Sequence, residues 1–171
     1  MFEIIPNLHP ILVHFTVALT ATAVGLFIVA RLLRGHTLGR ELQTVARWDL
    51  WLAALATLFT VAAGLYAYGT VTHDAPAHEV MNTHRNWALT TLAVLLGMAA
   101  WGWVQRGREA ASGPFLGGAV LLLLLVLTTA WFGGELVYRH GIGVMSLPEP
   151  EPEPEAAAGH THPGEEADHG H

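Results

Sequence analysis

The stretch "FLGGAVLLLLLVLTTAWFGG" (residues 115–134) decides the fold class of this chain, because it carries no charged side chain over a membrane-spanning length. A hydrocarbon core of roughly 30 Å is crossed by about 20 apolar residues in an α-helix. Its leucine run "LLLLLVL" (121–127) does not alternate polar with apolar residues, which excludes a strand of a membrane β-barrel. A transmembrane helix is therefore predicted.

Three further runs of this kind cover residues 11–30, 50–71 and 87–104. The composition agrees, since 52% of the residues are hydrophobic and 13% are charged, whereas about a quarter are charged in soluble domains. The leading segment "MFEIIPNLHP" has no lysine or arginine, so we expect a retained first helix rather than a signal peptide. The predicted fold is an all-α, integral membrane four-helix bundle with helices at about 10–33, 48–71, 83–105 and 114–139.

The character of the chain changes after this predicted domain, which covers residues 1–147. The repeat "PEPEPEPE" (148–155) is typical of an extended, polyproline-like spacer. The polar, histidine-bearing residues that follow cannot bury a core. Residues 148–171 are therefore predicted to form a disordered, acidic and histidine-rich tail.

The distribution of arginine predicts the orientation in the membrane. All eight basic residues are arginines, and only Arg85 and Arg139 fall outside the two loops that follow the first and third predicted helices. Positive loops remain in the cytoplasm, so both termini are expected on the outer side of the membrane. The six arginines of the two loops are Arg31, Arg34, Arg40, Arg47, Arg106 and Arg108.

Ten of the 11 histidines, all except His36, fall on this predicted outer side. His14, His84 and Glu135 should lie at one depth, and an ionisable residue in a membrane normally faces the bundle interior and has a partner. His9 and His14 point about 140° apart on a helix and should have different partners. The candidate metal ligands are His9, His14, His73, His78, His84, Glu135 and His140, with weaker candidates in the tail at His160, His162, His169 and His171.

Three functions are compatible with this pattern. The first is a redox module that holds a b-type haem by two of His14, His84 and His140. The second is the binding or handling of copper, zinc or nickel, with the tail as a collector of ions. The third is a structural or assembly subunit whose histidines form hydrogen bonds, and in which Glu135 simply pairs with Arg139.

Other classes of function are disfavoured. The chain has no cysteine, which rules out iron–sulfur clusters and thiol catalysis. It has no HExxH motif, and an enzyme is not expected. Nothing is basic enough for nucleic acid, so the expected partner is the lipid bilayer, with a second copy of the chain or another membrane subunit left open.

Three motifs resemble the bacterial membrane family known as domain of unknown function 2231: "HPILVHFTVAL" (9–19), "THRNWA" (83–88) and "GGELVYRHGIGV" (133–144). The resemblance covers roughly residues 5–146 and implies a four-helix protein of a bacterial inner membrane without an assigned reaction, so the outer side that holds both termini is expected to be the periplasmic side. This chain has Thr16 where the family usually has proline. The anchor positions implied by the resemblance are His9, Pro10, His14, His84, Gly133, Gly134, Tyr138, His140 and Gly141.

Overall fold

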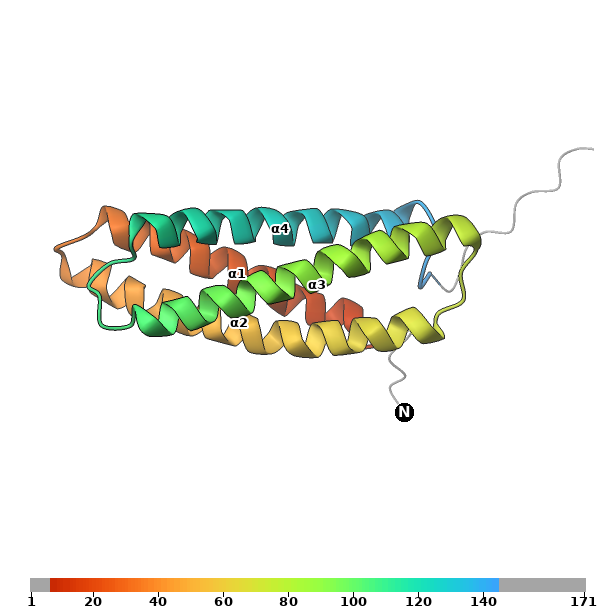
Figure 1. Ribbon diagram of the computed structural model, residues 1–171, viewed down its shortest axis with the longest axis horizontal. Coiled ribbons are helices and arrows are strands. Elements are labelled where there is room, and N and C mark those ends of the chain that lie inside the picture. Colours follow the sequence, from red (N-terminus) through yellow and green to blue (C-terminus); the bar gives the residue numbers. More distant parts are fainter. Residues whose placement is uncertain (1–6, 145–171) are drawn as a thin grey trace, which may run out of the picture.

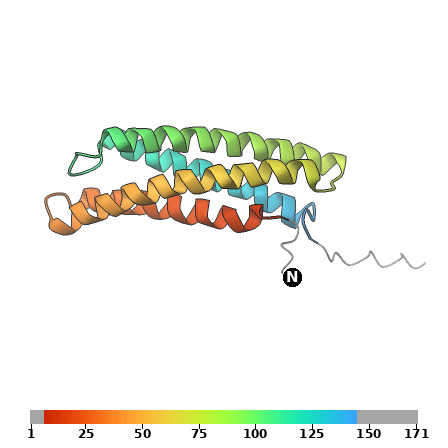
Figure 2. The same cartoon turned by 90° about the horizontal axis from the view of Figure 1, so that it is seen from below.

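The computed structural model describes residues 7–144, which form four antiparallel helices and no strand. The helices are α1 (His9–Leu32), α2 (Thr37–Thr70), α3 (Ala75–Val104) and α4 (Gly113–Tyr138). They run side by side along the long axis of the molecule (Figures 1 and 2). The prediction of an all-helical bundle with four helices able to span a membrane is confirmed.

The bundle consists of two helical hairpins, α1–α2 and α3–α4. Packing is more extensive within each hairpin than between the two, where α2 contacts α3 and α1 contacts α4. The start of α1, the α2–α3 connection and the end of α4 lie together at one end of the bundle (Figure 1). We call this the histidine end, and we call the opposite end, with the loops 33–36 and 105–112, the arginine end.

The outer surface of the bundle is apolar, as a lipid environment requires. Leu124, Phe59 and Trp131 expose 55%, 59% and 74% of their surface, and all three lie on helices long and apolar enough to cross a membrane. An apolar surface of this size would be unstable in water. Lipid chains therefore provide the solvent for these faces.

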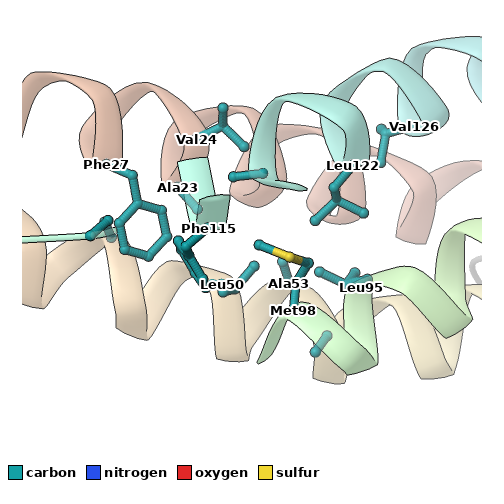
Figure 3. Close-up of a cluster of buried hydrophobic side chains, with 14 residues drawn as sticks. Ala23, Val24, Phe27, Leu50, Ala53, Leu95, Met98, Phe115, Leu122 and Val126 are labelled. Atoms are coloured by element: carbon teal, nitrogen blue, oxygen red, sulfur yellow. The ribbon is translucent and has the colours of Figure 1, made fainter. Parts of the chain in front are cut away.

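The core lies between the middle of the bundle and the arginine end, and it combines small residues with a few large ones (Figure 3). Phe27 of α1 meets Phe115 of α4 edge to face, with ring centroids 5.0 Å apart. Across the bundle, Gly102 of α3 lies close to Phe115 and Leu50, and an added Cβ would be in ordinary van der Waals contact with their side chains, at 3.7 Å and 3.4 Å. Close packing of this kind holds helices together in lipid.

Two helices begin earlier than the sequence predicts. α2 begins at Thr37 rather than near residue 48, because buried Gly39 and Gln43 continue its packed face beyond the apolar run. α3 begins at Ala75 rather than near residue 83, and its cap is Asp74, whose side chain accepts a hydrogen bond from the Ala77 N–H at 2.9 Å. The apolar runs mark where lipid contact begins, whereas backbone hydrogen bonding continues into the polar interface.

α4 ends within the motif "GGELVYRHGIGV". Gly141 has a φ of 62°, a conformation that favours glycine, and the N–H groups of Gly141 and Ile142 bond to the carbonyls of Val137 and Leu136. The bond from Gly141, a residue in the left-handed conformation, to the carbonyl four residues earlier terminates the helix as an αL cap. The predicted domain boundary at 147 and the predicted tail 148–171 lie outside the described residues.

The tight approach of α1 to α2 yields a first testable prediction. A Cβ at position 39 would lie 2.3 Å from the backbone oxygen of Leu33, whereas a Cβ at Gly25 would meet nothing within 4 Å. Gly39→Ala should therefore lower the free energy of unfolding by about 1–3 kcal/mol, and Gly25→Ala should not lower it. Thermal unfolding of both variants in detergent, followed by circular dichroism, checks this. Equal stability of the two variants would contradict the close contact between position 39 and the Leu33 oxygen.

Candidate functional site

Two imidazoles from different hairpins meet inside the histidine end. The ring centroids of His9 on α1 and His84 on α3 are 6.1 Å apart, with an angle of 82° between the ring planes. Both side chains are partly buried. Because α1 and α3 are diagonal neighbours without direct backbone packing, this ring pair is a contact across the axis of the bundle.

Each imidazole is oriented by a backbone carbonyl of its own hairpin. The Nδ1 atom of His9 lies 2.9 Å from the Thr60 oxygen on α2, and the Nδ1 atom of His84 lies 3.0 Å from the Thr129 oxygen on α4. A carbonyl oxygen only accepts, so each Nδ1 carries the hydrogen and donates it. In the neutral rings, the lone pair is therefore on Nε2.

Two glycines make these contacts sterically feasible. In an α-helix the carbonyl of residue i bonds to the N–H of residue i+4, so a side chain at i+4 crowds the free lone pair of that oxygen. Gly64 and Gly133 occupy this position after Thr60 and Thr129. A Cβ at Gly64 would lie 2.9 Å from His9 Nδ1, and one at Gly133 would lie 3.2 Å from His84 Cε1.

Each hairpin contributes one half of the ring pair, which we call a half-site, and the two half-sites have the same sequence pattern. The first helix of each hairpin carries His-x6-Thr, namely His9 and Thr16 on α1 and His84 and Thr91 on α3. The second helix carries Thr-x3-Gly, at the positions just described. The hydroxyls of Thr16 and Thr60 are 2.9 Å apart, as are those of Thr91 and Thr129. Each hairpin therefore holds one imidazole above one pair of threonines.

The side chains of the two hairpins differ on the arginine-end side of the threonine pairs. In the first hairpin, Thr57 donates to Ala53 O at 2.7 Å and lies 3.2 Å from the Thr16 hydroxyl, whereas the corresponding residue of α4 is the apolar Val126. Thr20 Oγ1 is buried without a hydrogen-bond partner among the described residues, and its counterpart on α3 is Leu95. The interior of the first hairpin is thus the more polar of the two.

His14 is not where the sequence predicts it. It was expected to meet His84 in a polar pocket, but it is exposed, and its Nδ1 donates to the Pro10 carbonyl of its own helix at 2.7 Å. His9 and Thr16 lie almost two full helical turns apart and share the inward face, and His14 lies on another face. His9 thus contacts His84 in place of His14.

Glu135 and His140 lie at the end of α4. The Glu135 carboxylate pairs with Arg139 one turn later at 2.9 Å, and the Arg139 side chain is 74% exposed. His140 is partly buried just beyond the helix. This ion pair is the local alternative that the sequence allowed for Glu135, and it occupies the carboxylate expected to complete a histidine site.

Two further candidates, His73 and His78, form a second, exposed group. His73 Nε2 and His78 Nδ1 are 2.9 Å apart at the α2–α3 connection. The tail candidates His160, His162, His169 and His171 lie outside the described residues. Within residues 7–144, no three histidine, aspartate or glutamate side chains come together as a metal site.

The two glycines yield a prediction about the oriented pair. Gly64→Ala and Gly133→Ala should each displace the neighbouring imidazole and lower the free energy of unfolding by about 1–3 kcal/mol, the usual cost of overpacking. Gly117→Ala is the matched control, because a Cβ there meets nothing within 4 Å. Thermal unfolding and ¹⁵N NMR of labelled histidine check this, and unchanged Nδ1–H signals of His9 and His84 in the respective variants would contradict it.

Comparison with known proteins identifies the family of the chain. The model of the family described as "Predicted membrane protein (DUF2231)" matches residues 5–146, which include all four helices and both half-sites. No similar curated protein and no similar solved structure was found. The chain belongs to this family of predicted membrane proteins.

Proposed function

We propose that this membrane protein is a bis-imidazole redox module, in which His9 and His84 would hold one b-type haem at the histidine end of the bundle. The observation that carries the proposal is the orientation of the two rings. Each ring donates its Nδ1–H to a backbone carbonyl and keeps the lone pair of Nε2 for a metal ion. Metal-ligating histidines typically donate their other ring N–H to a carbonyl or carboxylate, which fixes the tautomer. Haem contributes one-electron chemistry at its iron.

The spacing of the rings supports a single metal ion between them. A metal-bound imidazole nitrogen lies about 2.0–2.1 Å from the ion and just over 1 Å from its own ring centre, so two imidazoles on opposite sides have centroids roughly 6 Å apart. The observed separation is 6.1 Å. The ring centres thus lie at a separation compatible with one ion between them, and because the rings meet edge to face, at least one would have to turn its Nε2 toward the ion.

The number of donors favours haem iron over a bare zinc ion. Zinc usually takes four protein ligands in a structural site and three in a catalytic site. The described residues bring two imidazoles together here and no third ligand. A porphyrin supplies four nitrogens itself, and His9 and His84 would supply one further nitrogen each.

The porphyrin requires space between the hairpins. The His9 and His84 rings contact each other edge to face, so the hairpins have to separate locally for the group to enter. Packing between the hairpins is less extensive than packing within them, and this supports the seam between hairpins as the route of entry. Gly64 and Gly133 leave room for the two rings against α2 and α4.

The proposed orientation places this centre on the periplasmic side of a bacterial inner membrane. It rests on the six arginines near the arginine end, against Arg85 and Arg139 at the histidine end. Electrons would accordingly be exchanged with a partner at the outer surface. A structural role for the imidazole pair is the second candidate, favoured by the direct ring contact, and it predicts no bound cofactor.

Spectroscopy of the ligand variants tests the haem proposal. The full-length protein, expressed with haem supplied and purified in detergent, should show a Soret band that sharpens and shifts on dithionite reduction. His9→Ala and His84→Ala should each abolish the low-spin spectrum, because one axial ligand is lost. His14→Ala is the matched control and should retain the spectrum, since His14 is exposed and bonds within its own helix.

Metal analysis of the same samples separates the alternatives. A colourless protein with one retained copper ion per chain, lost in His9→Ala, would replace haem by a two-coordinate ion at the same pair. A colourless, metal-free protein that loses stability in both variants would support the structural role. A haem spectrum that survives the double variant His9→Ala/His84→Ala would exclude these ligands.

Reporter fusions test the proposed orientation. Alkaline phosphatase, which is active only in the periplasm, should be active when fused after residue 146 or inserted at residues 72–73, and inactive when inserted at residues 35–36. Green fluorescent protein should show the reverse pattern. The inverted result would place the imidazole pair at the cytoplasmic surface and overturn the arginine argument.

A further inference from the structure

The α2–α3 connection at the histidine end holds a second imidazole pair, separate from His9 and His84. His73 and His78 are both exposed, their rings are nearly parallel with an angle of 9°, and the ring centroids are 5.1 Å apart. His73 Nε2 lies 2.9 Å from His78 Nδ1. Two ring nitrogens of different residues thus face each other at the surface.

The surrounding hydrogen bonds determine which nitrogens can become metal donors. His73 Nδ1 lies 2.8 Å from the Val71 carbonyl, so it donates its hydrogen and leaves the Nε2 lone pair facing His78. Without a metal, the His78 Nδ1–H donates to that lone pair. If the hydrogen of His78 moves to Nε2, both facing nitrogens carry a lone pair and no net proton is released.

Tyr68 is placed to accept that hydrogen. Its hydroxyl donates to Asn82 Oδ1 at 2.8 Å and lies 3.4 Å from His78 Nε2, so its oxygen lone pairs face the imidazole. The Arg85 guanidinium lies 4.9 Å from the centre of the Tyr68 ring and holds the ring from its face. His78 therefore has a supporting partner on the side away from His73, as metal-bound histidines usually have.

The facing nitrogens are linked by a hydrogen bond when no metal is bound. His73 Nε2 and His78 Nδ1 are 2.9 Å apart, so an ion held by both nitrogens would replace this hydrogen bond. Imidazole nitrogens bind Cu²⁺, Ni²⁺ and Zn²⁺, and Cu²⁺ generally binds such ligands most tightly among these divalent ions.

We propose that His73 and His78 form an exposed site for a divalent transition-metal ion that binds imidazole, with Cu²⁺ as its probe. The site has two protein donors among the described residues, and water occupies the remaining positions. Asp74 and Glu79 lie beside the two histidines in the sequence and add negative charge near the ion. Binding at this site is exchangeable, and it is independent of the haem proposal.

The experiment is a Cu²⁺ titration of the full-length protein in which the four tail histidines are replaced by alanine, so that the tail does not compete. Electron paramagnetic resonance should show a square-planar Cu²⁺ signal with coupling to two nitrogens. His73→Ala and His78→Ala should each weaken binding by about tenfold or more, and Tyr68→Phe by a smaller factor. His36→Ala at the arginine end is the matched control and should bind as the parent does.

The outcomes decide the proposal. Unchanged Cu²⁺ affinity and nitrogen coupling in His73→Ala/His78→Ala would overturn it. Both residues are exposed, and a thermal unfolding curve equal to that of the parent shows that the variants fold. The haem spectrum of His73→Ala/His78→Ala should equal that of the parent, which separates failure of this site from failure of the His9–His84 site.

Discussion

Hydrocarbon offers no hydrogen-bond partner, and this constraint governs both the fold and the site. The backbone satisfies itself by forming helices. Polar side chains inside the bundle then have to use helix carbonyls or one another. Thr57, Thr60 and Thr129 donate to the carbonyl one turn earlier, and His9 and His84 donate to carbonyls of the adjacent helix. An imidazole that takes a carbonyl needs space beside that oxygen, and a glycine one turn later provides it.

Most of the fold follows from hydropathy, whereas the site requires the third dimension. Four apolar runs predict four helices, but they do not predict that α2 begins at Thr37, because residues 37–47 are polar and their burial against α1 is a tertiary property. The choice of His14 over His9 failed for a similar reason. Depth along the helix favoured His14, and the face of the helix, which decides contact, favours His9.

A signal for the correct pair was nevertheless present in the sequence. His-x6-Thr occurs at the start of α1 and again in α3, and Thr-x3-Gly occurs near the end of α2 and again in α4. Each pattern alone is common and short. Their significance comes from the pairing of the first pattern with the second inside each hairpin, which becomes visible once the helices are placed side by side.

The size of the buried residues differs between the hairpins at the arginine end. Phe27 of α1 corresponds to Gly102 of α3, and Ala46 of α2 corresponds to Phe115 of α4. The two large residues meet on one side of the bundle. For comparison, a four-helix bundle made of two identical hairpins would carry every such substitution twice, once in each copy. A single chain that contains both hairpins accepts it once, so one half-site can change while its counterpart retains the common pattern.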